Sequence, residues 1–287
     1  MDRVVILGAD SPAGEALVNQ LADKFHVTGL WFKQPVNRTD IATSRIDQAR
    51  LDKEIQLADT VYFCGGASRS SWDAGFGNFT AEEQWLAACV DRSAEAGAGL
   101  IYVSSDAAFN GPWVFHDDDA ACDLSCELGA KLHEMEELVA SHPDHLIIRT
   151  NVVGMTIGRG HFVDDVLSGL QNGQVRRIPA DTFSTPISEE GFALAAAECG
   201  MAETAGVINV GGAERTTPFR FASLLARQLG HDADLLAPAI ANGPTSERSL
   251  RCSRLRCELN IAAPLLSETI EQVCAGIVER TFHAAAA

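Results

Sequence analysis

Hydrophobic residues in the first 150 positions fall into short strand-like runs separated by segments with helical spacing. The apolar runs, each typical of a buried strand, cover residues 3–8, 26–32, 59–64, 100–104 and 145–150. Apolar positions with helical spacing predict helices at 13–21, 81–96 and 128–141. Strands that alternate with helices of this length indicate β-α-β units and right-handed crossovers. The pattern therefore predicts a doubly wound, Rossmann-like α/β fold with a parallel sheet.

The pattern changes after Thr150. Helical spacing continues at 162–172, 188–200, 218–229 and 267–280, with short extended pieces such as 207–210 between the helices. The stretch 231–250 is richer in Pro, Ala and Asn and is expected to be a loop. We expect this part to complete the sheet and to form a small lobe over its carboxyl edge, where such sheets bind ligands.

Composition and charge narrow the class of partner. Hydrophobic residues make up 46% of the 287 positions and charged residues 21%, which is typical of a globular protein. A net charge of −17 argues against nucleic acid or an anionic membrane as partner. No apolar run approaches the roughly 20 residues that span a bilayer. The eight cysteines lack C-x-x-C spacing and are expected to be reduced thiols, with no metal centre, in a cytoplasmic protein.

The first strand leads through the sequence GADSPAG into a helix. Gly8 and Gly14 stand where a dinucleotide fingerprint has its first and last glycines, which permit the tight turn and the close helix–strand packing. The middle position holds Ser11, which can donate to phosphate although its Cβ restricts the approach. The bend predicts a pyrophosphate site at the helix N-terminus, made by Gly8, Ser11, Pro12, Ala13 and Gly14. The alternative is a simple tight turn between strand and helix.

If the chain binds a dinucleotide, we expect two parts within it and a preference for one of the two nicotinamide cofactors. Residues 1–155 would form the dinucleotide-binding core, and 156–287 the mixed segment with the substrate lobe, within one compact unit. The second strand ends in Trp31-Phe32-Lys33, without an acidic residue for a ribose 2′-hydroxyl. Lys33 and Arg38 would instead suit a 2′-phosphate, which favours NADP over NAD.

Several segments resemble one enzyme family in the same order along the chain. The sequence LIYVSSDAAFNG at 100–111 resembles the pattern Y-x-S-T-D-x-V-F-x-G of dTDP-4-dehydrorhamnose reductases. IRTNVVG at 148–154 is similar to their RTSWVYG, and SLRCSRLRCELNI at 249–261 to their RP-x-x-S-x-L-x-x-x-K-L. The chain thus resembles, over nearly its whole length, these extended short-chain dehydrogenase/reductases, which are oxidoreductases acting on nucleotide sugars.

The resemblance implies further cofactor contacts. Asp47 matches an aspartate that contacts adenine, and Cys64, Gly65 and Gly66 match a small-residue cofactor turn. Ser104, at the end of the fourth predicted strand, is also expected at the cofactor. The resemblance implies NADP or NAD as cofactor, a sugar nucleotide as a further partner, and a homodimer as a candidate assembly.

The resemblance also implies a catalytic set, which is incomplete in this chain. Ser105 and Asp106 match the family's Ser/Thr and the acidic residue after it. Lys131 matches the lysine of Y-x-x-x-K, which by this resemblance would lower the pKa of the tyrosine and bind the nicotinamide ribose of the cofactor. Glu127 occupies the tyrosine position. A carboxylate one helical turn from a lysine stays ionised, so it cannot protonate a developing alkoxide. A plain i,i+4 helix pair of Glu127 with Lys131 is the alternative.

Three functions remain open on the sequence. The first function is a reductase of a nucleotide-sugar-like ketone that uses another proton donor, or a catalytically impaired relative of such a reductase. The second function is a non-catalytic, dinucleotide-sensing regulatory subunit, and the third a scaffold without ligand. Fold alone does not choose among them.

Overall fold

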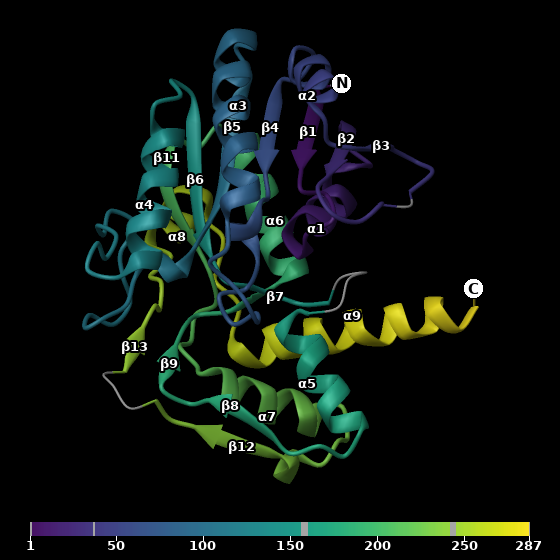
Figure 1. The fold of residues 1–287 in the computed structure, drawn as a ribbon, viewed down its shortest axis with the longest axis vertical. Coiled ribbons are helices and arrows are strands. Elements are labelled where there is room, and N and C mark those ends of the chain that lie inside the picture. Colours follow the sequence, from purple (N-terminus) through teal and green to yellow (C-terminus); the bar gives the residue numbers. More distant parts are fainter. Residues whose placement is uncertain (1, 37, 156–159, 242–244, 287) are drawn as a thin grey trace.

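The computed structural model describes residues 2–36, 38–155, 160–241 and 245–286, without the side chains of 80–82 and 281–286. A seven-stranded parallel sheet forms its centre, in the order β11-β6-β5-β4-β1-β2-β3 (Figure 1). The strands of this sheet are β1 (Arg3–Leu7), β2 (His26–Trp31), β3 (Ala42–Arg45), β4 (Thr60–Phe63), β5 (Gly99–Ser105), β6 (His145–Thr150) and β11 (Gly206–Val210). The strand order reverses between β1 and β4, which is the crevice where doubly wound sheets bind ligands.

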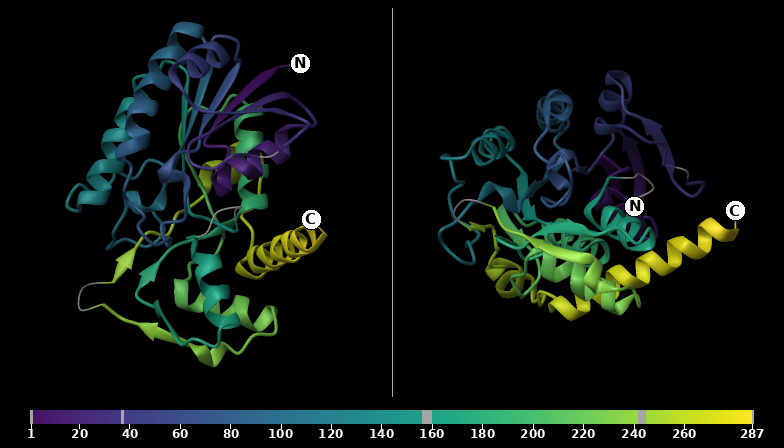
Figure 2. Two further views of the ribbon diagram at one scale, coloured as in Figure 1. Left: turned by 45° about the vertical axis from the view of Figure 1, so that its right-hand side comes forward. Right: turned by 60° about the horizontal axis from the view of Figure 1, so that its bottom comes forward.

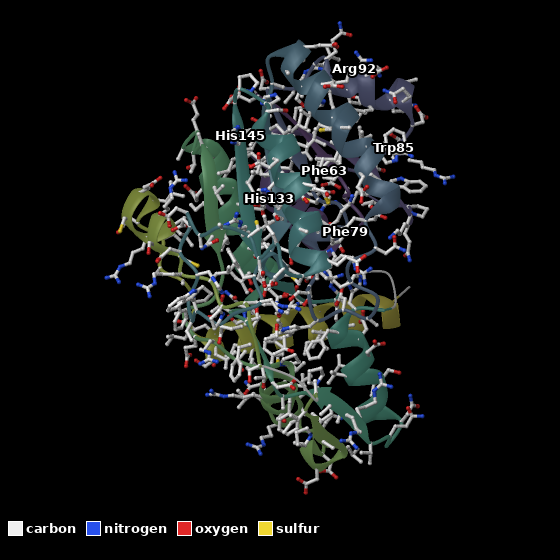
Figure 3. All side chains as sticks on the ribbon, turned by 60° about the vertical axis from the view of Figure 1, so that its left-hand side comes forward. Phe63, Phe79, Trp85, Arg92, His133 and His145 are labelled. Atoms are coloured by element: carbon white, nitrogen blue, oxygen red, sulfur yellow. The ribbon has the colours of Figure 1, made fainter. Side chains whose placement is uncertain are left out.

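Helices cover both faces of the sheet. The helices on one face are α2 (Gln48–Ile55), α3 (Thr80–Ala96) and α4 (Glu127–Ala140); those on the other are α1 (Pro12–Leu21), α6 (Glu189–Met201) and α8 (Ser253–Leu259). Val5 and Leu7 of β1 face the first set, whereas Val4 and Ile6 face the second. Because both faces are buried, residues 4–7 of this strand are all apolar rather than alternating with polar residues. Figure 3 views the α3–α4 side and labels Phe63, which has no exposed surface.

A smaller lobe lies beyond the carboxyl edge of the sheet, toward which β1 and β4 point in Figure 1. Its helices are α5 (Phe162–Gln171), α7 (Pro218–Gln228) and α9 (Leu266–Ala286), which bury a separate apolar core. Its short strands pair in parallel: β8 (Arg176–Pro179) with β12 (Leu236–Ala239), and β9 (Thr182–Phe183) with β13 (Ser246–Glu247). A third pair, β7 (Val152–Val153) with β10 (Ile187–Ser188), lies between sheet and lobe. Figure 2 shows the lobe and the projecting α9 from two further sides.

The predicted fold class is confirmed, and one local prediction is wrong. The stretch 231–250 was expected to be a loop, yet it contains β12 and β13. Neither strand has the alternating pattern that predicts a half-buried strand, and β12 includes Pro238. Both exist because an earlier lobe strand offers a partner for pairing, which local sequence does not reveal.

Candidate functional site

The bend after β1 depends on two glycines. Gly8 has a φ of +80°, and a Cβ added there would lie 1.9 Å from the carbonyl oxygen of Cys64. A Cβ at Gly14 would lie 2.1 Å from the carbonyl oxygen of Gly8. Both distances are far inside van der Waals contact, so the bend closes only with glycine at these positions. The bend therefore packs against the end of β4 at the reversal of strand order.

Ser11, at the middle-glycine position, begins helix α1. Its Oγ accepts a hydrogen bond from the backbone N–H of Gly14 at 3.0 Å, and Pro12 follows as the first helical residue. A hydroxyl that accepts one bond keeps its own hydrogen for donation. A helix N-terminus with such a donor suits a phosphate oxygen. Pro12, Ala13 and Gly14 are buried, Pro12 has no N–H, and the N–H of Gly14 is taken by the cap, so the fit to a pyrophosphate depends on the Ser11 hydroxyl.

The turn after β4 lies beside this bend. Cys64, Gly65 and Gly66 are all buried, and burial raises the pKa of the Cys64 thiol well above its ordinary value. The thiol is therefore a packing group and not a nucleophile. Ser68 Oγ donates to the carbonyl oxygen of Gly65 at 2.7 Å and lies 3.4 Å from Ser11 Oγ. Ser68 thus brings a second hydroxyl to the bend, a contact that the sequence did not predict.

The end of β2 carries a carboxylate from an unexpected source. Asp10, within the bend, accepts backbone hydrogen bonds from Phe32 at 2.9 Å, Lys33 at 2.8 Å and Gln34 at 3.0 Å. Strand β2 itself has no acidic residue there. In the sequence, this contact is indicated only by the acidic residue Asp10 at the third position of the bend GADSPAG.

Two other residues expected near the adenosine have partners of their own. Arg38 forms an ion pair with Asp40 and a hydrogen bond with Asn19. Asp47 is exposed and caps helix α2, because its Oδ1 accepts from the N–H of Arg50 at 2.8 Å. Capping leaves the rest of the Asp47 carboxylate open to other donors.

The predicted residues at the end of β5 face the protein interior. Ser104 Oγ donates to Glu136 Oε1 at 2.7 Å, and Glu136 forms a buried ion pair with Arg149. Ser105 has no exposed surface, and its Oγ donates to Asp106 at 3.3 Å. Asp106 is also fully buried, and burial raises its pKa. These side chains belong to a buried polar network in this arrangement.

Glu127 and Lys131 lie on helix α4, but not on the face of the helix that packs against the sheet. Its buried positions are Gly129, Leu132, Met135, Glu136 and Val139. Lys131 Nζ lies 3.2 Å from carboxylate oxygens of both Glu83 and Glu134, and hydrogen bonds to Glu134 and Glu83 raise the pKa of Lys131. Glu127 is exposed at the first position of the helix.

The two residues share a groove away from the end of β5. Glu127 and Lys131 line a groove of about 720 Å³ between α4 and the segment before α3, and Ser105 is absent from its lining. The ion pairs of Lys131 are with Glu83 and Glu134 rather than with Glu127. In the part of the chain that the structure describes, the four predicted catalytic residues thus form two separate groups.

Neither tyrosine offers a substitute proton donor. Tyr62 is buried and donates to the carbonyl oxygen of Ala196 at 3.2 Å. Tyr102 is fully buried, with its hydroxyl 3.8 Å from the sulfur of Met135. Both lie within strands, as the sequence predicts.

Asp73 connects the part of the chain that carries the large sheet to the lobe. Its carboxylate accepts from the N–H of Phe162 at 2.8 Å, pairs with His161 at 2.7 Å, and lies 3.1 Å from Arg69 Nε. Asp73 therefore caps α5, where His161 makes no side-chain cap of its own. No local pattern in the sequence indicates this contact, which joins residues 89 positions apart.

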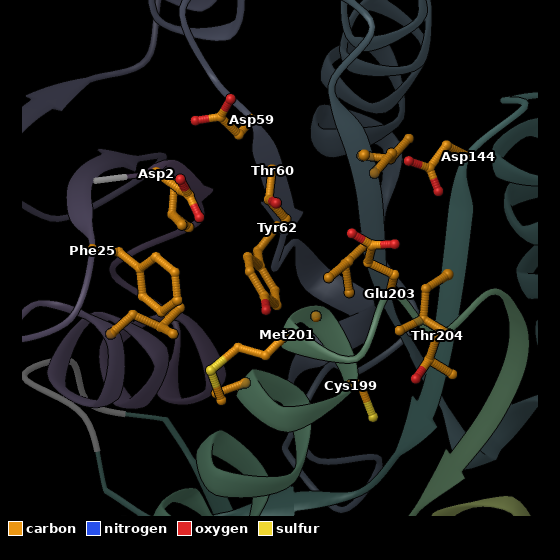
Figure 4. A pocket seen from close by; sticks show the side chains of 18 of the residues that line it. Asp2, Phe25, Asp59, Thr60, Tyr62, Asp144, Cys199, Met201, Glu203 and Thr204 are labelled. Carbon is orange, nitrogen blue, oxygen red and sulfur yellow. The ribbon is translucent and has the colours of Figure 1, made fainter. Parts of the chain in front are cut away.

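Another pocket opens at the opposite edge of the sheet. This cavity of about 470 Å³ is lined by residues at the amino ends of the strands, among them Asp2, Asp59 and Tyr62 (Figure 4). Ligands of doubly wound sheets bind at the carboxyl edge. The bend at Gly8, and not this pocket, is therefore the candidate site. Among the described residues, no helix combines the length and apolar character needed to cross a membrane.

Comparison with known proteins gives one family match. The family model described as the RmlD substrate binding domain matches residues 2–267. No curated protein sequence matches the chain.

Several solved structures share the fold. A hypothetical dTDP-4-dehydrorhamnose reductase from Sulfolobus tokodaii is 18% identical, with a TM-score of 0.74, over 92% of this chain and 98% of that one. The dTDP-4-dehydrorhamnose reductase of Bacillus anthracis in complex with NADP is 16% identical, with a TM-score of 0.72, over 95% and 98%. A UDP-glucuronic acid 4-epimerase from Bacillus cereus in complex with NAD is 16% identical, with a TM-score of 0.77, over 96% of each chain. At these identities the likeness is one of fold.

Proposed function

Because this chain belongs to the RmlD substrate-binding-domain family, we propose that it binds an NAD(P) dinucleotide with the pyrophosphate at the Gly8–Gly14 bend. The observation that carries the proposal is the cap at Ser11. Its hydroxyl lies at the N-terminus of α1 and retains a hydrogen to donate to phosphate. The dinucleotide would supply hydride-transfer chemistry, and the chain would supply its orientation.

We infer that the second ligand is a nucleotide sugar held between the sheet edge and the lobe. Structural relatives are named for nucleotide sugars, such as the UDP-glucuronic acid 4-epimerase. The positive charge of Arg248 acts on Asp106 at the end of β5. Arg215 lies over the ring of Phe183 at 3.8 Å and forms an ion pair with Glu247 at 2.7 Å, and it brings a second guanidinium to the lobe side. Guanidinium groups suit the diphosphate of such a ligand.

We propose further that the chain binds these ligands without efficient reduction. Protonation of a ketone oxygen needs a donor near the nicotinamide. Ser105 is buried, Glu127 is exposed at the start of α4, and Lys131 pairs with two carboxylates. This separation supports the impaired relative, or the dinucleotide-sensing regulatory subunit, over an ordinary reductase.

A slow reductase is the second candidate. The observation that favours it is the buried contact of Ser105 with Asp106 at the end of β5, where burial raises the pKa of Asp106. A rearrangement that exposes Ser105 would give this pair access to a substrate oxygen.

One experiment separates these functions. NADH and NADPH are titrated by fluorescence, and oxidation of the bound form is then followed with a dTDP-4-keto-6-deoxy sugar. Saturable binding without oxidation supports the impaired or sensing function, and oxidation supports the slow reductase. Absence of binding by both dinucleotides overturns the proposal and leaves the scaffold.

The residues at the end of β2 bear on the choice between NAD and NADP. Lys33 and Arg38 were the two cations behind the expected preference for NADP. The ion pair of Arg38 with Asp40 weakens that expectation, since the guanidinium already has a carboxylate partner. This supports NAD as the dinucleotide.

A further inference from the structure

The structure assigns to Asp10 the selection of NAD over NADP, an inference that rests on the proposed dinucleotide site. In doubly wound folds an acidic residue at the end of the second strand, about 20 residues after the fingerprint, binds the ribose 2′-hydroxyl. Strand β2 ends here in Trp31 and is followed by Phe32 and Lys33. Asp10 brings a carboxylate to this same place from the bend after β1.

Three backbone hydrogen bonds fix the position of this carboxylate. Oδ1 accepts from Phe32, and Oδ2 accepts from Lys33 and Gln34, all between 2.8 and 3.0 Å. The bend and the end of β2 also meet through backbone, since the N–H of Gly8 donates to Leu30 at 2.7 Å. The carboxylate is therefore held between the pyrophosphate site and the end of β2.

The carboxylate retains capacity for a ribose hydroxyl. An ionised carboxylate offers about four lone-pair sites. The three backbone bonds of Asp10 use three of them, two on Oδ2 and one on Oδ1. The remaining site on Oδ1 suits a hydroxyl donor such as the ribose 2′-OH. A 2′-phosphate has no equivalent donor when ionised, so it meets only the negative charge.

The charges around this site give a 2′-phosphate no excess of positive charge. Lys33 and Arg38 are the cations of this segment, and Asp10 and Asp40 are its carboxylates. The two pairs of opposite charges sum to zero. A 2′-phosphate dianion next to the Asp10 carboxylate therefore gains no excess positive charge, and like charges at close range disfavour binding.

The experiment compares adenosine fragments and dinucleotides. The probes are 5′-AMP against adenosine 2′,5′-bisphosphate, and NADH against NADPH, titrated into the full chain by calorimetry or fluorescence. We expect the wild type to bind NADH and 5′-AMP more tightly than their 2′-phosphorylated partners by about tenfold or more. Asp10→Ser keeps a short acceptor for one backbone N–H, and we expect it to reduce this ratio to near one by tightening NADPH.

Two measurements keep the test informative. Asp40→Asn is the matched control, because it removes one carboxylate of the same segment without touching the bonds to residues 32–34. Asp40→Asn is expected to shift the NADH-to-NADPH ratio less than Asp10→Ser does. Thermal unfolding of each variant confirms that the variant is folded, and Asp10→Asn serves as the second variant if Asp10→Ser unfolds.

The outcomes separate this inference from the proposed function. If neither dinucleotide binds the wild type, the proposed function fails, and the inference with it. If both bind, but NADPH binds as tightly as NADH or the ratio is unchanged in both folded Asp10 variants, the role of Asp10 is overturned while the dinucleotide site stands.

Discussion

The Oγ of Ser11 accepts a hydrogen bond from the backbone N–H of Gly14 at 3.0 Å. The residue that replaces the middle glycine of the fingerprint is therefore also the N-cap of α1. The Ser11 side chain therefore has two roles: it stabilises the start of α1, and it holds its hydroxyl at the helix N-terminus, where the proposed phosphate would bind.

Removal of the cap is expected to destabilise the fold by a defined amount. Ser11→Ala loses the side-chain bond to Gly14 and should cost about 1 kcal/mol of unfolding free energy, as N-cap losses do. Ser11→Gly should cost only a few tenths of a kcal/mol. Urea unfolding of the three proteins measures the difference. Equal stability of Ser11→Ala and the wild type would show that the cap contributes nothing.

Gly8 and Gly97 provide a matched pair of left-handed glycines. Their φ values are +80° and +70°, but a Cβ at Gly8 would meet the carbonyl of Cys64, whereas nothing lies within 4 Å of one at Gly97. Gly97→Ala should cost about 1–2 kcal/mol from conformation alone. Gly8→Ala should cost clearly more, or prevent folding. Similar unfolding midpoints for the two variants would contradict the tight packing of the bend.

Much of this site follows from the sequence for a physical reason. The centres of buried parallel strands are apolar, so β1 and β6 are visible as apolar runs at 4–7 and 146–148. A bend directly after the first strand must lie at the carboxyl edge of the sheet. The placement of Gly8 and Gly14 is thus a consequence of chain order.

Other features needed the three-dimensional arrangement. Lys131 lies one position before the buried Leu132, and one position on a helix is a rotation of about 100°. Sequence spacing alone did not reveal that Lys131 meets Glu83 and Glu134. Asp10 and Asp73 act on backbone N–H groups 22 and 89 positions away, which no local pattern encodes.

The orientation of Lys131 on α4 leads to a prediction about dinucleotide affinity. Because its ammonium is held by Glu83 and Glu134, Lys131→Ala is expected to leave dinucleotide affinity within about twofold of the wild type. A lysine that holds the nicotinamide ribose would instead cost a large part of the affinity. Fluorescence titration with NADH measures the change, and Lys53→Ala, a lysine on the separate helix α2, is the control. A loss of about tenfold or more in Lys131→Ala alone would restore the family role of this lysine.

Glu189 is expected to make stability depend on pH. Burial raises the pKa of Glu189 from 4.5 to about 8, although Arg280 lies 3.2 Å away. A carboxyl whose pKa rises on folding binds its proton more tightly in the folded state. Its contribution to stability is therefore most favourable below pH 4.5 and is lost as the pH rises toward 8.

The variant Glu189→Gln should remove this pH dependence. We expect it to raise the unfolding free energy at pH 8 by about 1 kcal/mol or more relative to the wild type, and to change it little at pH 4.5. Glu190→Gln, at an exposed neighbouring position, is the control. Urea unfolding at both pH values gives the comparison. A larger gain at pH 4.5 than at pH 8 would reverse the expected sign.

The substitution Ser11→Asp tests the phosphate site most directly. Aspartate caps a helix as well as serine does, so the fold should be retained. Its negative charge would, however, repel a pyrophosphate at the N-terminus of α1. NADH is titrated by fluorescence into wild type and variant, with urea unfolding of both. We predict saturable binding to the wild type and an affinity about tenfold or more weaker in Ser11→Asp, at unchanged stability. Equal affinity in the two proteins, or no binding to the wild type, would contradict a pyrophosphate site at this bend.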